Sequence, residues 1–469
     1  MRKNREQQKK GMVRQLSLFE DQIKPAISYD GRTGSETCAG VELLSQLESQ
    51  RTLTENLLEA VVDYGNLRNA YQRVRQNKGS AGIDEMDVEA LGNWLNNNLI
   101  TFREAVLAEN YQPGPVWKVM IRKPDGGERM LGIPTVKDRM LQQAIHQILS
   151  RYYDPLFSDN SYGFRPGRNA HQAILQASRF ISSGKEWVVD IDLEKFFDNV
   201  NHDRLMQRLS KGIGDKRLLR LIKSYLKSGI MSEGLTEQRI AGTPQGSPLS
   251  PLLSNIVLDE WDKEMEKRGH NFCRYADDCN IYVRSRKAGE RVLTSMVKFL
   301  EQKLKLKVNR QKSGVRHCSE ATFLGYTLLE EGNIRVADKS IKRLKDKVRE
   351  ITRRNRGVRF EQLIKELNAL IIGWTNYFYL ANRWLSELTA IDGWIRRKLR
   401  CYRLKQCGRR YTVFKLLHNL GIPETTSWNV VMYSQGWWAM SKKQAVGKAM
   451  GTKWFAQLGL HSLLTQIQR

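Results

Sequence analysis

The sequence predicts an α+β fold in which an antiparallel sheet and helices come first and an all-helical region follows. Two segments, at 116–134 and 272–283, carry strand-forming residues on either side of turn residues, as β-hairpins do. Beyond residue 335, apolar residues instead recur at intervals of three and four, which is typical of helices. The chain therefore changes from mixed structure to helices near residue 335.

Composition indicates a polyanionic partner. The 469 residues allow two to four domains, and 77 Lys and Arg against 50 Asp and Glu give a net charge of +27, which favours nucleic acid or an anionic membrane. No apolar run approaches the ~20 residues that span a bilayer, and the basic N-terminus lacks the apolar stretch of a signal peptide. Six scattered cysteines without CxxC spacing indicate a reducing cytoplasm without disulfides or a zinc module. We therefore expect nucleic acid as partner and no membrane.

The elements follow in order. Residues 1–50 are polar and basic, so we expect a flexible basic arm there. The remaining patterns predict helices over 53–75, 137–151, 204–226 and 249–268, and a strand over 187–193. Beyond them we expect mixed structure to residue 335, a small helical domain over 336–400, and a basic, aromatic tail over 401–469.

Two groups of carboxylates stand out. Asp277 and Asp278 are adjacent in the turn of Tyr275-Ala276-Asp277-Asp278, and a fold tolerates such a pair best when a divalent cation binds it. An ordinary Asp-rich turn is the plainer interpretation. In the strand over 187–193, Asp190 and Asp192 share the face opposite the apolar residues, which is costly to bury unless a cation or Arg pairs with them. Spacing alone does not show whether Asp190 or Asp192 is the metal ligand.

Two motifs then resemble those of reverse transcriptases. Asp192-Leu193-Glu194-Lys195-Phe196-Phe197-Asp198 is similar to the first palm motif, and Tyr275-Ala276-Asp277-Asp278 is similar to the catalytic hairpin. The resemblance implies a right-hand polymerase with fingers and an antiparallel palm sheet over 51–335. It implies that Asp192, Asp277 and Asp278 are catalytic and bind two Mg²⁺ ions, for which Mn²⁺ is a substitute, and that Leu193 adds its backbone carbonyl. Asp190 is left as a structural acid.

The resemblance also implies a dNTP site. The residues that match it are Lys123, Arg129, Phe197, Gln245 and Gly246. Phe197 matches the steric gate that excludes a 2′-hydroxyl, and Lys312 matches the position that protonates the leaving pyrophosphate. Taken singly, each has a plainer interpretation. Phe197 suits an ordinary core ring, Lys123, Arg129 and Lys312 suit solvated surface cations, and the loop with Gln245 and Gly246 suits the start of a helix.

Further motifs indicate which reverse transcriptases are most similar. The segment Tyr162-Gly163-Phe164-Arg165-Pro166-Gly167-Arg168 resembles one in group II intron and related bacterial enzymes, and residues 370–378 resemble the maturase domain, which forms the thumb. A Lys/Arg-rich run over 335–359 is otherwise a solvated face, but on a helix beside a palm it suits RNA phosphates. The residues expected to bind RNA are Arg353, Arg354, Arg356, Arg396 and Arg397.

The expected function is that of an intron-encoded RNA-directed DNA polymerase. It would bind its group II intron RNA to assist splicing and copy it by target-primed reverse transcription, with an RNA template, a DNA primer or target, and dNTPs as partners. An intron-free bacterial reverse transcriptase used in phage defence or DNA repair, and a non-catalytic RNA-binding splicing factor, are the alternatives. We expect a cytoplasmic bacterial protein, associated with the nucleoid during mobility, without an HNH endonuclease domain; a homodimer stays open.

Overall fold

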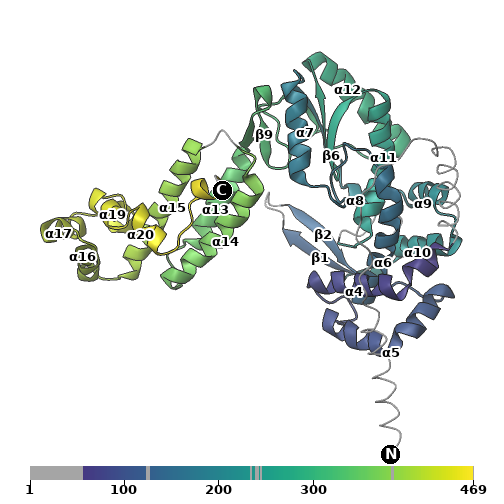
Figure 1. Cartoon of the computed structure of the whole chain (residues 1–469), viewed down its shortest axis with the longest axis horizontal. Helices are drawn as coiled ribbons and strands as arrows, with labels where there is room; N and C mark the ends of the chain where they lie inside the picture. Colours follow the sequence, from purple (N-terminus) through teal and green to yellow (C-terminus); the bar gives the residue numbers. More distant parts are fainter. Residues whose placement is uncertain are drawn as a thin grey trace, which may run out of the picture. The chain divides into compact units, whose positions relative to one another are not determined.

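The computed structural model describes residues 56–122, 127–232, 235–237, 242, 246–381 and 385–467 (Figure 1). They form two compact units. Unit 1 combines the described residues up to Ser158 with Glu194–Lys263 and Leu300–Lys307, and unit 2 combines Asp159–Leu193, Glu264–Phe299 and the described residues from Val308 onward. The expected arm over 1–50 lies outside the described residues.

Unit 1 contains a four-stranded sheet in the order β2-β1-β4-β5. Strands β1 (Val116–Arg122) and β2 (Glu128–Ile133) pair antiparallel, which confirms the hairpin predicted over 116–134. Strand β4 (Ile230–Ser232) lies parallel to β1, and β5 (Leu235–Glu237) pairs antiparallel with β4. Helix α6 (Val136–Tyr153) follows, and its N-cap is Thr135, whose side chain accepts from the Asp138 amide, as N-cap residues do.

Two predicted helices are each divided in the structure. The predicted helix over 53–75 is described as α3 (Leu57–Val61) and α4 (Tyr64–Gln76), with Asp63 as the N-cap of α4. The single helix predicted over 204–226 is wrong: α9 (His202–Gly212) ends and α10 (Lys216–Lys227) begins afresh. In both cases an Asp side chain accepts hydrogen bonds from the first amides of the new helix, which favours a restart over continuation. Helices α5 (Val88–Leu107) and α11 (Ser250–Lys267) complete the longer elements.

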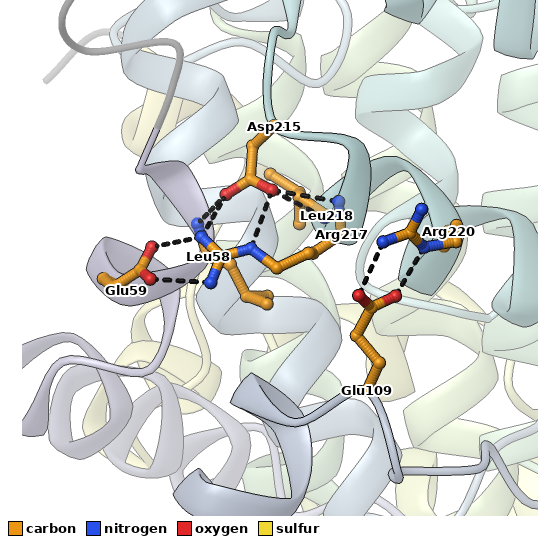
Figure 2. A network of polar contacts seen from close by, with 7 residues as sticks. All are labelled: Leu58, Glu59, Glu109, Asp215, Arg217, Leu218 and Arg220. Atoms are coloured by element: carbon orange, nitrogen blue, oxygen red, sulfur yellow. Dashed lines mark hydrogen bonds and ion pairs between the residues drawn. The ribbon is translucent and has the colours of Figure 1, made fainter.

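One buried carboxylate ties α3 to α10 in unit 1. Asp215 accepts from the Leu58 amide at 3.0 Å and from the Arg217 amide at 3.0 Å. Figure 2 shows that the Arg217 side chain lies between Asp215 and Glu59, 3.2 and 2.8 Å away. Burial raises the pKa of Asp215, but the hydrogen bonds from Leu58, Arg217 and Leu218 outweigh it, so its pKa is lowered. The carboxylate is therefore both a helix cap and an ion-pair partner.

Unit 2 contains the antiparallel sheet, in the order β6-β7-β3-β8. Its strands are β6 (Asn271–Tyr275), β7 (Asp278–Val283), β3 (Trp187–Ile191) and β8 (Gly314–His317), and all neighbours pair antiparallel. Helix α7 (Ala170–Ser182) contacts β6, and α12 (Arg286–Lys298) contacts β3 and β8. Because β3 ends at Ile191, two residues earlier than predicted, Asp192 lies at the start of a loop.

From Asp338 onward, the described part of unit 2 is helical, as predicted for the region beyond residue 335. A small sheet of β9 (Tyr326–Leu328) and β10 (Ile334–Val336) precedes α13 (Asp338–Ile351), α14 (Phe360–Phe378) and α15 (Leu385–Gln406). Helix α15 runs across residue 400, where a boundary was expected. Six helices follow, α16 (Arg410–Asn419), α17 (Glu424–Met432), α18 (Gly436–Met440), α19 (Gln444–Ala449), α20 (Thr452–Gln457) and α21 (Leu463–Ile467). Among the helices that the structure describes, none is long and apolar enough to cross a bilayer.

Candidate active site

The acidic hairpin predicted from the sequence is present. Strands β6 and β7 pair up to Tyr275 and Asp278, so Ala276 and Asp277 form the turn. Ala276 adopts a left-handed backbone with φ of 60°, an uncommon conformation for a residue with a side chain. Such a conformation persists where the surroundings hold it.

Arg274 is the residue that holds the turn, and sequence reasoning missed it. Its fully buried guanidinium donates to the Ala276 carbonyl at 2.9 Å and to Oγ of Ser161 at 2.7 Å. The Arg274 backbone amide donates to the Asn160 carbonyl at 2.9 Å, and the Tyr162 amide donates to the Arg274 carbonyl at 2.8 Å. Residues 160–162, before α7, therefore pair with β6 and support the hairpin.

Gly163 explains why the segment over 162–168 approaches the hairpin so closely. A Cβ at this position would collide with the backbone amide of Ala276 and with the backbone of Tyr275. Only glycine leaves room for that approach. The motif that resembled group II intron enzymes is thus in direct contact with the acidic turn.

Asp192 is positioned by the turn over 309–313. Its backbone amide donates to Oγ of Ser313 at 3.0 Å, and its carbonyl accepts from the Asn309 amide at 2.8 Å. Lys312 belongs to the same turn, and its Nζ lies 3.4 Å from Oδ2 of Asp192. Leu193, next along the chain, forms an isolated antiparallel bridge with Val308. The turn therefore brings together the predicted catalytic carboxylate and the predicted proton donor.

Asp190 has a specific partner. Arg316 on β8 donates from Nη1 to Oδ2 of Asp190 at 2.7 Å, and from Nη2 to the Lys312 carbonyl at 2.8 Å. Since β3 lies between β7 and β8 in the sheet, the arginine can reach across the strand pair. Of the two partners expected from the sequence for such an acid, a cation or an Arg, Asp190 has an Arg.

The carboxylates interact electrostatically. Burial, together with the charges of Asp190, Asp277 and Asp192, raises the pKa of Asp278 to about 8. Burial also raises the pKa of Asp190, although Arg316 opposes that shift. Within the described ranges, no three Asp, Glu, His or Cys side chains lie close enough together to hold a metal ion as they stand. The donor set nevertheless fits one, because carboxylate oxygens are the ligands of hard divalent cations and a cation would relieve the repulsion at Asp278.

Of the residues predicted for dNTP binding, Arg129, Phe197 and Gly246 are described and belong to unit 1. Phe197 lies in the short helix α8 (Phe196–Asn199), is buried, and meets the Phe196 ring edge-on at 5.4 Å. Gly246 has φ of 113°, and a Cβ there would collide with the Gly132 carbonyl of β2. Gly246 therefore fits closely against the fingers-like hairpin.

The remaining residues predicted to contact the dNTP are Lys123, Arg129 and Gln245. Lys123 and Gln245 lie outside the described residues. The backbone of Arg129 pairs with Ile121 across β1 and β2. The proposed facing of Lys123 and Arg129 stays a prediction.

The residues predicted to bind RNA differ in their surroundings. Arg353 and Arg354 are exposed in the loop after α13. Arg356 is already engaged, since its Nη1 lies 2.8 Å from Oε2 of Glu366 and donates to the Ile351 carbonyl at 2.7 Å. On α15, the Arg397 guanidinium lies 3.8 Å from the centre of the Trp438 ring. Of these three arginines of the loop, Arg356 is thus held in an ion pair within the protein.

Comparison with known proteins agrees with these features. Residues 121–328, which include Asp192, Asp277 and Asp278, match the reverse transcriptase (RNA-dependent DNA polymerase) family. Residues 341–417, from α13 to α16, match the maturase-specific domain of group II introns. The chain belongs to the group II intron reverse transcriptase/maturase family.

Individual relatives of this reverse transcriptase/maturase support the assignment. Protein YkfC of Escherichia coli K12 is 31% identical over 318 residues, which cover 59% of this chain and 84% of YkfC. The group II intron-encoded protein LtrA of Lactococcus lactis is 29% identical over 325 residues, 55% of this chain and 54% of LtrA. A putative COX1/OXI3 intron 2 protein of Saccharomyces cerevisiae is 26% identical over 382 residues, 66% of this chain and 43% of that protein. The alignment thus spans about half the length of LtrA.

Proposed function

We propose that this reverse transcriptase/maturase binds the RNA of a group II intron, assists its splicing, and copies it into DNA by target-primed reverse transcription. The observation that carries the proposal is the position of Asp190, Asp192, Asp277 and Asp278 at one end of the antiparallel sheet. Burial there, together with the charges of the other three carboxylates, raises the pKa of Asp278 to about 8. These carboxylates lie in a chain that also matches the maturase-specific domain over 341–417. A purely structural acidic turn would not require a facing carboxylate.

The metal site is proposed to involve Asp192, Asp277, Asp278 and the Leu193 carbonyl. Two Mg²⁺ ions, or Mn²⁺ in their place, would supply the polarisation of the primer 3′-hydroxyl and the neutralisation of the pyrophosphate. Lys312 lies 3.4 Å from Asp192, where its ammonium can deliver a proton to the leaving pyrophosphate. Arg316 holds the Lys312 carbonyl and Asp190, so it fixes the lysine relative to the acids.

Substrate selection is proposed to come from unit 1. Lys123 and Arg129 would bind the triphosphate, because two cations at a hairpin suit its charge. The Phe197 ring would exclude a 2′-hydroxyl, and Gln245 with Gly246 would pack against the new base pair. The partners are then dNTPs and an RNA template with a DNA primer or target.

RNA binding is proposed to use the basic helical part of unit 2. Arg353, Arg354, Arg396 and Arg397 would contact intron phosphates, in keeping with the net charge of +27 and with the salt-dependent binding of such surfaces. Domains are proposed as fingers and palm over 51–335, thumb over 336–400 and a C-terminal nucleic-acid-binding region over 401–469. The proposed place of action is the bacterial cytoplasm, with association to the nucleoid during mobility.

The direct test uses the RNA transcribed from the DNA that flanks the open reading frame. The full chain should accelerate splicing of that precursor and extend a DNA primer annealed to it. Both activities should need a divalent cation. Extension of any primed RNA without an effect on splicing would instead favour the intron-free reverse transcriptase.

A further inference from the structure

A basic cavity of about 470 Å³ lies in the helical part of unit 2, apart from the carboxylates. The end of α13, the loop after it, helix α15 and helix α18 contribute to it. Its cations are Arg349, Arg353, Arg354, Lys398 and Lys405, and its aromatic residue is Trp437. The volume falls within the range of small-ligand pockets, roughly 300–1,000 Å³.

Positive charge in this cavity is poorly compensated. No side chain among those that line it is acidic, although Arg349 is paired with Asp346 on its own helix. Burial lowers the pKa of Lys398, and the neighbouring charges of Arg349, Arg354 and Arg397 lower it further. Lys405 Nζ donates to the Arg354 carbonyl at 3.1 Å, which holds the loop against α15. A bound anion would relieve this repulsion.

Trp437 is the aromatic residue among those that line the cavity, and it is partly buried against the core of the unit. Its neighbours already lie under cations: Lys398 Nζ is 4.9 Å from the Trp438 ring centre and 5.7 Å from that of Trp394. Among the ring–cation and ring–ring contacts of the described residues, none involves Trp437. Asn355, which also lines the cavity, has an amide that can both donate to and accept from a base edge. A flat ring and an amide beside cations suit a nucleobase and its phosphates.

We propose that this cavity binds one unpaired nucleotide of an RNA strand, with its flanking phosphates on the five cations and its base against Trp437. A paired base is stacked on both faces and cannot present a face to the ring, whereas a bulged or looped base can. An acidic peptide would use the cations but would have no use for the ring. The inference deepens the proposed function, on which it rests for the identity of the strand as RNA.

The test measures binding of the full chain to a short RNA hairpin with one bulged 2-aminopurine, and to the same hairpin fully paired. Wild type should bind the bulged hairpin about tenfold more tightly, as base–aromatic stacking predicts. Trp437→Ala should remove that preference while affinity for the paired hairpin stays within about twofold, and Trp437→Phe should restore most of it. Equal binding of both hairpins by wild type, or a preference that survives in Trp437→Ala, would overturn the proposal.

Two matched variants separate the cavity from general effects. Trp428→Ala removes a ring stacked on Phe414, 4.3 Å between centres, and should keep the preference. Lys398→Ala should weaken bulged-RNA binding at least about fivefold, whereas Lys415→Ala, whose ammonium lies over Tyr411, should leave it unchanged. A hexaglutamate peptide that displaces the bulged RNA at equal concentration would contradict an RNA ligand, as would a bulge preference seen only with DNA. Primer extension is scored separately, so its failure with an intact bulge preference would count against the polymerase alone.

Discussion

Arg316 donates a hydrogen bond of 2.7 Å from Nη1 to Oδ2 of Asp190. The pair connects Asp278 with Lys312: the charge of Asp190 contributes to the raised pKa of Asp278, and Arg316 also donates to the Lys312 carbonyl. A half-buried acid beside three other carboxylates is tolerated when a cation neutralises it. Arg316 is therefore proposed as a positioning residue for the predicted catalytic carboxylates and for Lys312.

Removal of Arg316 should slow cDNA synthesis. Arg316→Ala leaves Asp190 without its cation and the Lys312 carbonyl without its side-chain donor. We therefore expect the rate to fall about tenfold or more and the Mg²⁺ concentration for half-maximal rate to change. Asp190→Asn combined with Arg316→Ala should recover part of the rate, since no unpaired charge remains. Arg286→Ala, in an exposed pair with Glu290, is the control. Equal rates of cDNA synthesis in wild type and Arg316→Ala would show that Arg316 does not position the acidic site.

Gly163→Ala should disturb the acidic hairpin. The new Cβ would collide with the Ala276 backbone amide, and a backbone clash cannot be relieved by side-chain rotation. We expect a loss of about 1–3 kcal/mol in the free energy of unfolding, as overpacking gives, and a larger loss of primer extension. Gly373→Ala on α14, where a Cβ meets nothing within 4 Å, should be neutral or stabilising by up to ~1 kcal/mol. Urea unfolding and extension assays on both variants decide, and equal behaviour of the two would contradict the close approach.

The acidic motifs were predictable because their signals are local. Asp277 and Asp278 are adjacent, and the alternation over 187–193 placed Asp190 and Asp192 on one face. By contrast, Arg316 lies 126 residues from its partner Asp190, and no periodicity connects them. Arg274 was missed because the sequence pattern of a strand does not distinguish a buried arginine from an exposed one. The single helix over 204–226 was wrong although Asp215 carries a local capping signal, because the apolar spacing continues through the break.

Asp215→Asn should destabilise unit 1 in a pH-dependent way. The carboxylate accepts from three backbone amides and pairs with Arg217, so we expect a loss of about 2–4 kcal/mol at pH 7. Its folded pKa is lowered, so its contribution is present above the unfolded pKa of about 3.9 and is lost as pH falls through the folded value. Unfolding measured between pH 7 and pH 3 should show the difference from wild type shrinking with acid.

The control for the Asp215→Asn variant is Glu109→Gln. Glu109 pairs with Arg220 at a more exposed position (Figure 2), where ion pairs contribute about 0–1 kcal/mol. A Glu109→Gln variant as unstable as Asp215→Asn would show that burial and capping do not set the difference.

Phe197→Ala should admit ribonucleotides. If the ring lies under the sugar, its removal should reduce discrimination against rNTPs about tenfold or more in single-nucleotide incorporation. Phe196→Ala is the matched control, because that neighbouring ring is buried to a similar degree and its loss should cost similar stability, about 3–5 kcal/mol. An unchanged ratio of dNTP to rNTP incorporation in Phe197→Ala would refute the steric-gate assignment.

The central claim is that Asp192, Asp277 and Asp278 form a DNA-polymerising metal site that is separate from the RNA-binding surface. The most direct measurement is primer extension and intron-RNA affinity of Asp277→Asn/Asp278→Asn, with folding verified by circular dichroism. Both substitutions keep side-chain shape and remove the charges that would hold the metal ions. We predict that extension at saturating Mg²⁺ falls below detection, while RNA affinity and its salt dependence stay within about twofold of wild type. Extension at the wild-type rate would contradict the account, as would a parallel loss of RNA binding in a folded variant.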